Sequence, residues 1–545
     1  MANVLLVSYA GYPYTPSSLC PDNGLALLAA VLKQAGHHVL IADFGTLATM
    51  RRLYPEELSR RVLPVLSELM ASAGQPKPEH LAELGRLDAQ LEAHQAQEVQ
   101  AIAHEIAQLV EDLEPAFVGF KLWNGDGFTG SVVIAEELRR RFPSLKFFAG
   151  GPHATWGAHY IYHYTDAFDA VMLGEGEERI LDLLAHATEG KSLDGVPGLI
   201  RSAEDRATPS ASYDLAELPT AIYDEEVYPS MAGDEKLKML VVDDSRGCPY
   251  RCAFCTHPYE SGRRLRLRPA ERLAEDMALL SHQPGVRAFR FAGSSTPGSL
   301  MAEVAHNLVD QGLDVTYTTF AHFASSAPDH FELMRRSGLY AMFFGLESGS
   351  QDLLRRATGK PIKIEEVKET VRAAQAAGIK VACSVIVPLP FETEETLGET
   401  LDFLVDLRPD SVPVQFPGLL PGTPWFDRPE HYGFELDRDE YLRENLNYKF
   451  KLLFPPTFWK PLPYRLNGQD FTQFVKTTGR FVAALESEGI LTDVPDDNML
   501  MAHLGGLSDR EFRDRARLWC VAGLVDAMRD FVLRYNKAAT SPPED

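Results

Sequence analysis

The sequence has few cysteines, and they are not spaced as in a secreted protein. Six occur in 545 residues, at Cys20, Cys248, Cys252, Cys255, Cys383 and Cys520. Small secreted domains pair closely spaced cysteines, so this distribution argues against a disulfide framework and for a reducing compartment. The sequence also lacks a signal peptide and any apolar run long enough to cross a bilayer. We therefore expect a cytoplasmic protein without a membrane span.

Positive charge is scarce relative to negative charge. The chain has 53 lysines and arginines against 77 aspartates and glutamates, which gives a formal net charge of −24. Such a surface repels nucleic acid and anionic lipid, so we expect neither as a general partner. Apolar residues make up 45% of the chain, and its 545 residues are enough for about three domains. The expected partner is a small-molecule substrate.

Three cysteines lie close together, and no fourth lies near them. Cys248, Cys252 and Cys255 have the spacing C-x3-C-x2-C. A protein-bound [4Fe–4S] cluster normally takes four thiolates, so three leave one iron for a substrate or cosubstrate. Zinc in a Cys3His site with His257 is the alternative. The surrounding residues make the loop resemble the cluster loop of the radical S-adenosylmethionine (SAM) superfamily: Gly247, Pro249, Tyr250 and Phe254.

Residues 1–185 alternate short apolar runs with amphipathic helices. This pattern predicts a doubly wound α/β domain, with a parallel sheet covered on both faces. Strands are expected at 4–9, 38–42, 117–122, 146–149 and 170–173, and a helix at 24–36. A long insertion, 50–114, predicts two helices joined by a turn, which we interpret as a structural cap on the sheet.

Glycine-containing turns follow two of these strands, at residues 150–155 and 174–177. Glycine lets the backbone approach a ligand at the carboxyl edge of such a sheet, although ordinary turns have the same composition. Together with residues 21–29 and Asp43, these turns resemble the cobalamin-binding domain that precedes many radical SAM domains. The resemblance implies a set of cobalamin-binding residues: Trp123, Asn124, Gly150, Gly151, His153, Gly174, Glu175 and Gly176.

One motif of many cobalamin proteins is missing. The string Asp-x-His-x-x-Gly, which supplies a histidine to cobalt, does not occur, and His153 has a different context. The resemblance implies that the corrin's own base is displaced and that no histidine replaces it. Without a strong ligand on the lower face of cobalt, cycling between methylcobalamin and cob(I)alamin is favoured.

Residues 186–238 are rich in glycine and proline, which indicates a linker. A second series of strands is expected at 239–243, 288–292, 315–320, 341–345, 381–387 and 412–416. The first leads directly into the cysteine loop, as in a partial (β/α)6 barrel with its chemistry at the strands' carboxyl ends. We therefore expect a radical SAM domain at 239–424. A mainly helical region at 425–545, with helices at 469–488 and 509–535, should close over the barrel.

The ends of the barrel strands resemble the SAM-binding positions of the superfamily. The segment 291–295 takes the place of the methionyl amino site, although its usual acidic residue is missing. Any one of these strand-end segments could occur in an unrelated barrel. Their order after the cluster loop is what supports the resemblance. The resemblance implies that SAM is bound by Phe254, Gly293, Ser295, Glu347, Ser348, Ser384 and Val387.

Two further features leave alternatives open. A basic run, Arg263, Arg264, Arg266 and Arg268, either pairs with a carboxylate or phosphorus oxyanion of a substrate or forms a solvated strand edge. Several aromatic residues either line the substrate pocket or pack in the core: Tyr448, Phe454, Phe458, Trp459 and Tyr464.

The resemblance as a whole implies a cobalamin-dependent radical SAM methyltransferase. Its cofactors would be a [4Fe–4S] cluster, SAM and cobalamin in the form of methylcobalamin, with an external flavodoxin- or ferredoxin-like electron donor. It would methylate an unactivated carbon, or a phosphinate phosphorus as in phosphinothricin-type P-methyltransferases, of a small metabolite in antibiotic or natural-product biosynthesis. One alternative is a related enzyme that performs oxidative cyclisation or rearrangement. A zinc-stabilised ligand-binding module is the other, and no residue is assigned to catalysis itself.

Overall fold

The first sheet of the computed structural model, which describes residues 1–71, 77–211, 213–449 and 459–541, has the strand order β2-β1-β3-β4-β5-β6. The strands are β1 (Asn3–Ser8), β2 (His38–Asp43), β3 (Phe117–Lys121), β4 (Lys146–Gly150), β5 (Ala170–Met172) and β6 (Leu199–Ile200). The first five are parallel, and β6 pairs antiparallel with β5. Apolar side chains on both faces of β1 are buried, as expected for a covered parallel sheet.

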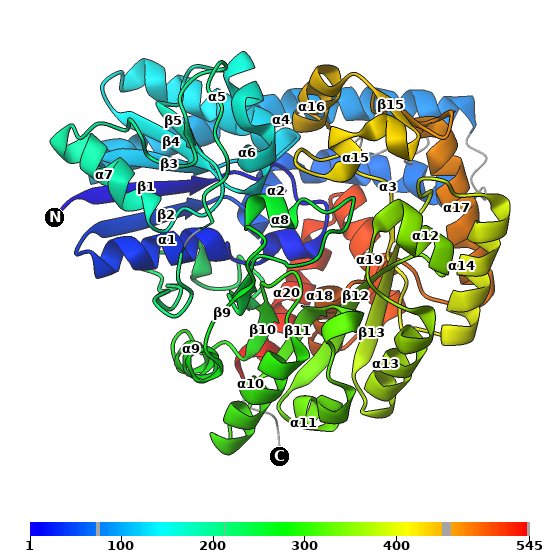
Figure 1. Ribbon diagram of the computed structural model, residues 1–545. Coiled ribbons are helices and arrows are strands. Elements are labelled where there is room, and N and C mark those ends of the chain that lie inside the picture. The colour runs from blue at the N-terminus through cyan, green and yellow to red at the C-terminus, as the bar shows by residue number, and fades with distance from the viewer. Residues whose placement is uncertain (72–76, 212, 450–458, 542–545) are drawn as a thin grey trace.

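Helices cover both faces of this sheet (Figure 1). On one face, α1 (Asn23–Gln34) and α7 (Arg179–Glu189) pack against side chains such as Leu6. On the other face, α4 (Pro78–Leu113) and α5 (Asp126–Arg141) pack against side chains such as Leu5. A short helix, α6 (Pro152–Gly157), follows β4 at the carboxyl edge. The predicted doubly wound domain is confirmed.

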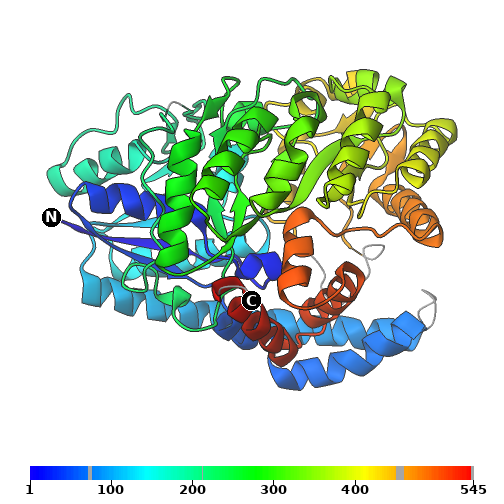
Figure 2. The ribbon, with the colours of Figure 1, turned by 90° about the horizontal axis from the view of Figure 1, so that it is seen from below.

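The insertion contains three helices in place of the two predicted. They are α2 (Leu47–Leu53), α3 (Glu56–Ala71) and α4, and the predicted turn at 74–78 lies mostly outside the described residues. The Tyr54 hydroxyl donates to the Val521 carbonyl (3.2 Å) and the Ser59 hydroxyl to that of Ala522 (2.6 Å). Figure 2 shows these helices beside the C-terminal ones. The insertion therefore also joins the first domain to the end of the chain.

The second sheet is a six-stranded partial barrel with the order β14-β13-β12-β11-β10-β7 and only parallel neighbours. Its strands are β7 (Leu240–Val242), β10 (Ala288–Phe291), β11 (Thr316–Ala321), β12 (Leu339–Glu347), β13 (Lys380–Ile386) and β14 (Val414–Gln415). The outer helices are α9 (Ala270–His282), α10 (Gly298–Asp310), α11 (Phe331–Arg336), α13 (Ile364–Ala376) and α14 (Glu394–Leu407) (Figures 1 and 2). Every predicted barrel strand is present.

Short elements connect these parts. A hairpin of β8 (Ser245–Arg246) and β9 (Arg266–Leu267) encloses the cysteine loop and α8 (His257–Glu260). After β12 come α12 (Gln351–Leu353) and a π-helical turn, Leu354–Thr358. The region after the barrel contains α15 (Pro424–Asp427), α16 (Arg438–Leu446), a small sheet of β15 (Phe434–Leu436), β16 (Tyr464–Leu466) and β17 (Gln469–Asp470), and α17 (Phe471–Ser487).

The prediction of one helix over 509–535 is wrong. The structure has two, α19 (Asp509–Val521) and α20 (Val525–Thr540), separated at Gly523, where φ is +64°. A Cβ at this position would collide with the Tyr54 ring, so the turn requires glycine. Before them, α18 (Asp496–Leu504) packs against β11, β12 and β13 and closes one side of the barrel.

The aromatic residues after the barrel divide between core and loop. Tyr464 is buried, lies 5.3 Å from the Phe474 ring between centroids, and donates its hydroxyl to the Pro417 carbonyl (2.9 Å). The Tyr448 hydroxyl donates to the Lys460 carbonyl (2.8 Å). Core packing is therefore the better interpretation for Tyr464. Phe454 and Phe458 lie outside the described residues.

None of the helices in the described part of the chain has both the length and the hydropathy needed to cross a bilayer.

Candidate active site

The cysteine loop is fixed between the β8–β9 hairpin and the turn that follows β12. The backbone N–H of Cys248 donates to the Gly262 carbonyl (3.1 Å), and that of Ala253 donates to the Thr358 carbonyl (2.7 Å). Because β7 leads into the hairpin, the loop lies at the carboxyl end of the barrel strands. This is the end at which barrels of this kind carry their chemistry.

The three thiols are withdrawn from solvent, and two of them accept backbone hydrogen bonds. Burial raises the pKa of Cys252 to about 12 and that of Cys255 to about 11, while the charge of Lys360 opposes both shifts. Backbone N–H groups of Tyr250 and His257 donate to the sulfurs of Cys248 and Cys255. Desolvated thiols give up their protons to bound metal, and N–H groups directed at sulfur are usual around iron–sulfur clusters.

The arrangement of these ligands bears on the choice between one ion and several. Within the described ranges, no three His, Cys, Asp or Glu side chains converge on a point where one metal ion would sit. A cubane does not need such convergence, because each thiolate binds a different iron. The donor set therefore fits a [4Fe–4S] cluster.

Lys360 is a cation at the cluster loop that the sequence did not indicate. Its ammonium group lies 2.8 Å from Glu347 Oε1 and donates to the Gly345 carbonyl (2.6 Å). Both side chains of this ion pair are buried, with 7% and 6% exposed. Glu347 is therefore paired within the protein. A SAM molecule beside it would face a locally neutral pair and not a free carboxylate.

A second group missed in the sequence is Asp244, which directly precedes the hairpin. Its carboxylate accepts from the Gly293 N–H (2.6 Å), the Thr296 hydroxyl (2.7 Å) and the Ser245 hydroxyl (2.8 Å). Burial raises the pKa of Asp244 to about 6, although these hydrogen bonds oppose the shift. Asp244 therefore fixes the segment after β10 against the cluster loop and uses the N–H of Gly293 to do so.

The other predicted SAM residues lie around the same opening. Phe254 packs 5.6 Å from the Trp425 ring, and Ser295, Ser384 and Val387 are buried at or near strand ends. The Ser348 hydroxyl is in a hydrogen bond with the Thr400 hydroxyl (3.0 Å) and accepts from the Ser350 N–H, so it has a structural partner.

Three buried polar atoms near this opening are not hydrogen-bonded within the described protein: Ser294 Oγ, His322 Nε2 and Thr256 Oγ1. Ser294 follows β10, His322 follows β11, and Thr256 follows the third cysteine. Buried polar atoms normally have partners. Their presence fits a polar ligand such as SAM at the carboxyl end of the barrel.

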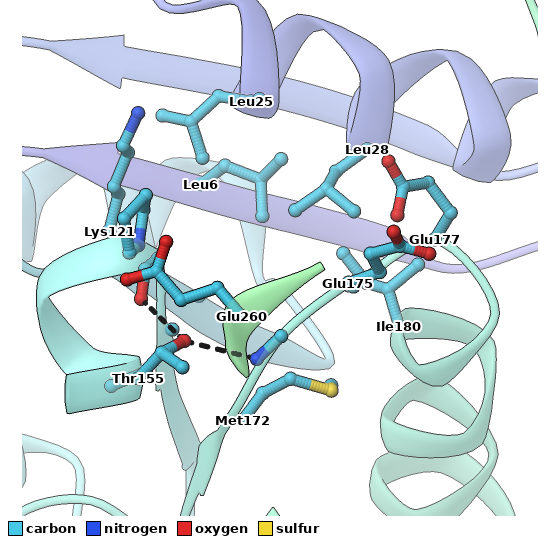
Figure 3. A pocket seen from close by; sticks show the side chains of 18 of the residues that line it. Leu6, Leu25, Leu28, Lys121, Thr155, Met172, Glu175, Glu177, Ile180 and Glu260 are labelled. Carbon is cyan, nitrogen blue, oxygen red and sulfur yellow. Dashed lines mark hydrogen bonds between the residues drawn. The ribbon is translucent and has the colours of Figure 1, made fainter. Parts of the chain in front are cut away.

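A cavity of about 380 Å³ lies between the first sheet and the cysteine hairpin. Figure 3 shows Leu6, Leu25 and Leu28 on one side, Met172 and Ile180 on the opposite side, and Glu260 of α8 reaching in between them. This size is within the range of small-molecule sites. Five of the predicted cobalamin residues line it: Gly150, Gly151, Gly174, Glu175 and Gly176.

The two glycine turns at this cavity are tied together by Thr155. Its hydroxyl donates to the Gly151 carbonyl (3.2 Å) and accepts from the Gly174 N–H (3.0 Å) (Figure 3). Gly119 on β3 leaves the slot open, because a Cβ there would lie 2.9 Å from Leu6 Cδ2. Glu177 Oε2, a buried acceptor on the lining, has no partner within the described protein. An apolar slot with an available acceptor fits the ring and amide groups of cobalamin.

A second cavity, of about 480 Å³, adjoins the first at Gly24 and Lys121. Trp123 and Asn124 line it together with barrel residues such as Met239 and Arg290. The Lys121 ammonium group lies 4.5 Å from the Trp123 ring centroid. The predicted cobalamin residues are therefore divided between two neighbouring cavities.

His153 contacts Trp123 and Asn124, the two predicted cobalamin residues that line the second cavity. Its ring lies 5.6 Å from the Trp123 ring, and its Nδ1 accepts from the Asn124 N–H (3.1 Å). Burial, with the charge of Lys121, lowers the pKa of His153 to about 4, so the ring is neutral at pH 7. A neutral ring that accepts at Nδ1 carries its proton on Nε2. As it lies, His153 has no free lone pair for cobalt.

The His153 environment predicts a pH dependence of stability. Its pKa is 6.5 in the unfolded chain and about 4 in the folded protein, so the unfolded state binds more protons between these values. The free energy of unfolding of the apoprotein, relative to that of His153→Gln, should fall by about 2 to 3 kcal/mol from pH 7 to pH 4. Urea titrations of both proteins at pH 7 and pH 4 test this. If the difference between their free energies of unfolding is the same at both pH values, the prediction is wrong.

An ion-pair network, which we call the clasp, joins the glycine turn of the first domain to the cysteine hairpin. It consists of Glu175, Glu177, Asp243, Arg246 and Arg266. Arg246 lies 2.6 Å from Glu177 and 2.9 Å from Asp243, and Arg266 pairs with Glu175. All five side chains are at most 14% exposed.

The clasp corrects the interpretation of the basic run. Arg266 is paired in the clasp, and Arg268 lies 2.6 Å from Asp276 with 2% of its side chain exposed. Neither alternative, a substrate anchor or a solvated edge, describes these two residues. Arg263 and Arg264 are exposed.

Removal of Arg246 should destabilise the protein strongly. Arg246→Met leaves the carboxylates of Glu177 and Asp243 buried without their cation, which costs about 3–5 kcal/mol. We expect a lower urea midpoint, whereas exposed Arg336→Met should change the free energy of unfolding by less than about 0.5 kcal/mol. Equal midpoints for the two variants would show that the clasp carries no such energy.

Two family models match the chain where these features lie. The B12 binding domain matches residues 86–184, and the radical SAM superfamily matches residues 242–404. The chain therefore contains a B12-binding domain and a radical SAM domain, and the cofactors of these two domains are cobalamin for the first and a [4Fe–4S] cluster with SAM for the second. The matched residues lie within the predicted domains 1–185 and 239–424, whose exact boundaries stay predictions.

The chain is similar to proteins with more than one activity. A solved structure of the radical SAM methyltransferase TsrM from Kitasatospora setae, with cobalamin and a [4Fe–4S] cluster bound, has a TM-score of 0.63 at 16% identity and covers 96% of this chain and 99% of that one. The uncharacterized methyltransferase PH0819 of Pyrococcus horikoshii is 26% identical over 338 residues, 58% of this chain and 70% of that protein. The anaerobic magnesium-protoporphyrin IX monomethyl ester cyclase of Rubrivivax gelatinosus is 26% identical over 291 residues, and the chain spans about half (51%) of its length.

Proposed function

We propose that the protein transfers a methyl group from SAM, by way of cobalamin, to a small metabolite. The observation that carries this proposal is the shared lining of the 380 Å³ cavity, because the glycine turns of the first sheet and the cysteine hairpin both contribute to it. When bound, a reduced cluster supplies the electron that cleaves SAM, and cobalamin supplies a methyl carrier. The similarity to two methyltransferases supports this reaction.

The protein's own residues orient and enclose the reactants. Asp244 and the Lys360–Glu347 pair fix the strand ends at the cluster loop, and the clasp holds the two domains in one arrangement. Such fixed positioning removes much of the entropic barrier to a reaction between separate reactants. We propose that the second cavity, which borders the barrel, receives the substrate.

Within this reaction, an unactivated carbon is the preferred acceptor over a phosphinate phosphorus. Arg266 and Arg268, which would have anchored a phosphorus oxyanion, are paired with Glu175 and Asp276. In the second cavity, Arg290 is paired with Asp496 and Asp497, and Lys121 with Asp22. We propose a natural-product precursor of low negative charge as the substrate, in an antibiotic or related pathway.

Cyclisation without methyl transfer is the second candidate, favoured by the cyclase similarity. The test is to incubate the anaerobically reconstituted, reduced protein with hydroxocobalamin and methyl-deuterated SAM and to analyse the products by mass spectrometry. The methyltransferase proposal expects deuterated methyl bound to cobalamin as well as 5′-deoxyadenosine. Deoxyadenosine without label on cobalamin would favour the cyclase type.

A further inference from the structure

Five exposed arginines, which we call the arginine patch, are on the cysteine loop and on the two segments that are hydrogen-bonded to it. It consists of Arg251, Arg263, Arg264, Arg355 and Arg356, all exposed. Arg251 lies between Cys248 and Cys252 in the sequence. The side chains of Arg355 and Arg356, in the π-helical turn after β12, are 76% and 52% exposed.

All five arginines are on segments in contact with the cluster loop. Arg263 and Arg264 directly follow Gly262, whose carbonyl accepts from the Cys248 N–H. The turn that contains Arg355 and Arg356 ends at Thr358, whose carbonyl accepts from the Ala253 N–H (2.7 Å). A Cβ on the next residue, Gly359, would lie 3.6 Å from the Arg251 carbonyl oxygen.

Three of the five cations of this patch have no acidic partner among the described residues, and the other two share one carboxylate. Arg251, Arg263 and Arg264 form no ion pair with any described residue, and Arg355 and Arg356 share Asp352. Their neighbours Arg266 and Arg268 are buried in ion pairs. Such a concentration of like charge, on a protein with a net charge of −24, repels itself, and only Arg356 of the five lies over an aromatic ring, that of Phe391 (4.9 Å).

We propose that the arginine patch is the docking surface for an acidic one-electron carrier protein, such as a flavodoxin, that reduces the cluster. This inference rests on the proposed function, because SAM cleavage consumes an electron that the substrate does not supply. The carrier is oxidised by one electron and the cluster is reduced by one, with no bond formed or broken in this chain.

The location and size of the patch fit such a transient partner. Electron transfer requires the two redox centres to approach closely, and the arginines of the patch are on the segment that contains the cluster ligands and on the two segments hydrogen-bonded to it. Opposite charges raise the association rate, and redox pairs use small contacts that release the partner quickly.

The test uses charge reversal and measures reduction of the cluster, not methyl transfer. R251E/R263E/R264E and R263E/R264E are reconstituted and mixed in a stopped-flow instrument with reduced flavodoxin at low ionic strength. We expect the triple variant to be reduced at least about tenfold more slowly than the wild type. Reduction by dithionite, a small reductant, should change less than about twofold because it needs no docking surface.

The matched control reverses three cations at the other end of the barrel. Arg529, Arg534 and Lys537 are exposed on α20, and Ala539 of that helix accepts from the N–H of Arg287, which precedes β10. R529E/R534E/K537E changes the net charge by the same amount and should be reduced by flavodoxin at the wild-type rate.

Several outcomes would overturn the proposal. An unchanged flavodoxin rate in the patch variants, or equal slowing in the α20 control, rules out a local docking surface. A wild-type rate that does not fall with added salt excludes electrostatic docking. If R251E/R263E/R264E binds less iron than the wild type, the rate at which flavodoxin reduces R263E/R264E is the deciding measurement, because this variant leaves the C-x3-C segment unchanged. A wild-type protein that assembles no reducible cluster contradicts the proposed function instead, and with it the need for a carrier.

Discussion

Cys252→Ala abolishes the iron–sulfur cluster: after anaerobic reconstitution, we expect the iron content to fall from about four per chain to below about one. Cys252 is the central ligand of the loop, and without it only Cys248 and Cys255 of the three thiolates remain to hold the cluster. Iron analysis and the visible absorbance of the cluster measure the effect.

Two other variants serve as controls for this result. Cys20→Ala removes a cysteine far from the loop in sequence and should retain the cluster. His257→Ala removes the side chain required by a Cys3His zinc site but keeps the backbone N–H that donates to Cys255. It should therefore also retain iron. Unchanged iron in Cys252→Ala, or loss of metal in His257→Ala equal to that in Cys252→Ala, would contradict the cluster assignment.

Gly119→Val is expected to block cobalamin binding. Gly119 lies on β3 at the slot, and its Cβ would lie 2.9 Å from Leu6 Cδ2 and 3.5 Å from the Phe117 ring, so a branched side chain must displace the slot wall. We expect the affinity for hydroxocobalamin to fall by about a hundredfold, which corresponds to about 2.8 kcal/mol. Equilibrium dialysis measures it.

The iron content of the same variant distinguishes a local from a global effect. The cluster ligands are outside the first sheet, so Gly119→Val should bind iron as the wild type does. Gly398→Val in α14 is a matched control, because a Cβ there would meet no atom within 4 Å. Wild-type cobalamin affinity in Gly119→Val would show that the slot is not the cobalamin site.

The parallel strands of both sheets were predictable from their apolar runs, whereas the short antiparallel strand β6 lies in the predicted linker and was missed. Val4 to Val7 and Val381 to Val387 are buried on both faces, as parallel strands under helices must be, so their composition indicates them without knowledge of the fold. The break between α19 and α20 was missed because the apolar pattern continues past Gly523, and the Tyr54 ring that requires glycine lies just after α2, far away in the sequence.

The pairing of charged side chains was not predictable, because it depends on contacts between segments far apart in the sequence. Lys360 forms an ion pair with Glu347 across a turn, and Arg246 forms one with Glu177 of the first domain. In the basic run, the sequence shows four similar arginines, whereas the structure buries Arg266 and Arg268 and exposes Arg263 and Arg264. Only the fold determines which side of the hairpin each one faces.

The most direct test of the account is the metal content of the wild-type protein. The protein is reconstituted anaerobically with iron, sulfide and hydroxocobalamin, desalted, and analysed for iron, labile sulfide, cobalt and zinc. We expect about four iron and four sulfide with about one cobalt per chain, and little zinc. One zinc per chain without iron, or no retained cobalt, would contradict it.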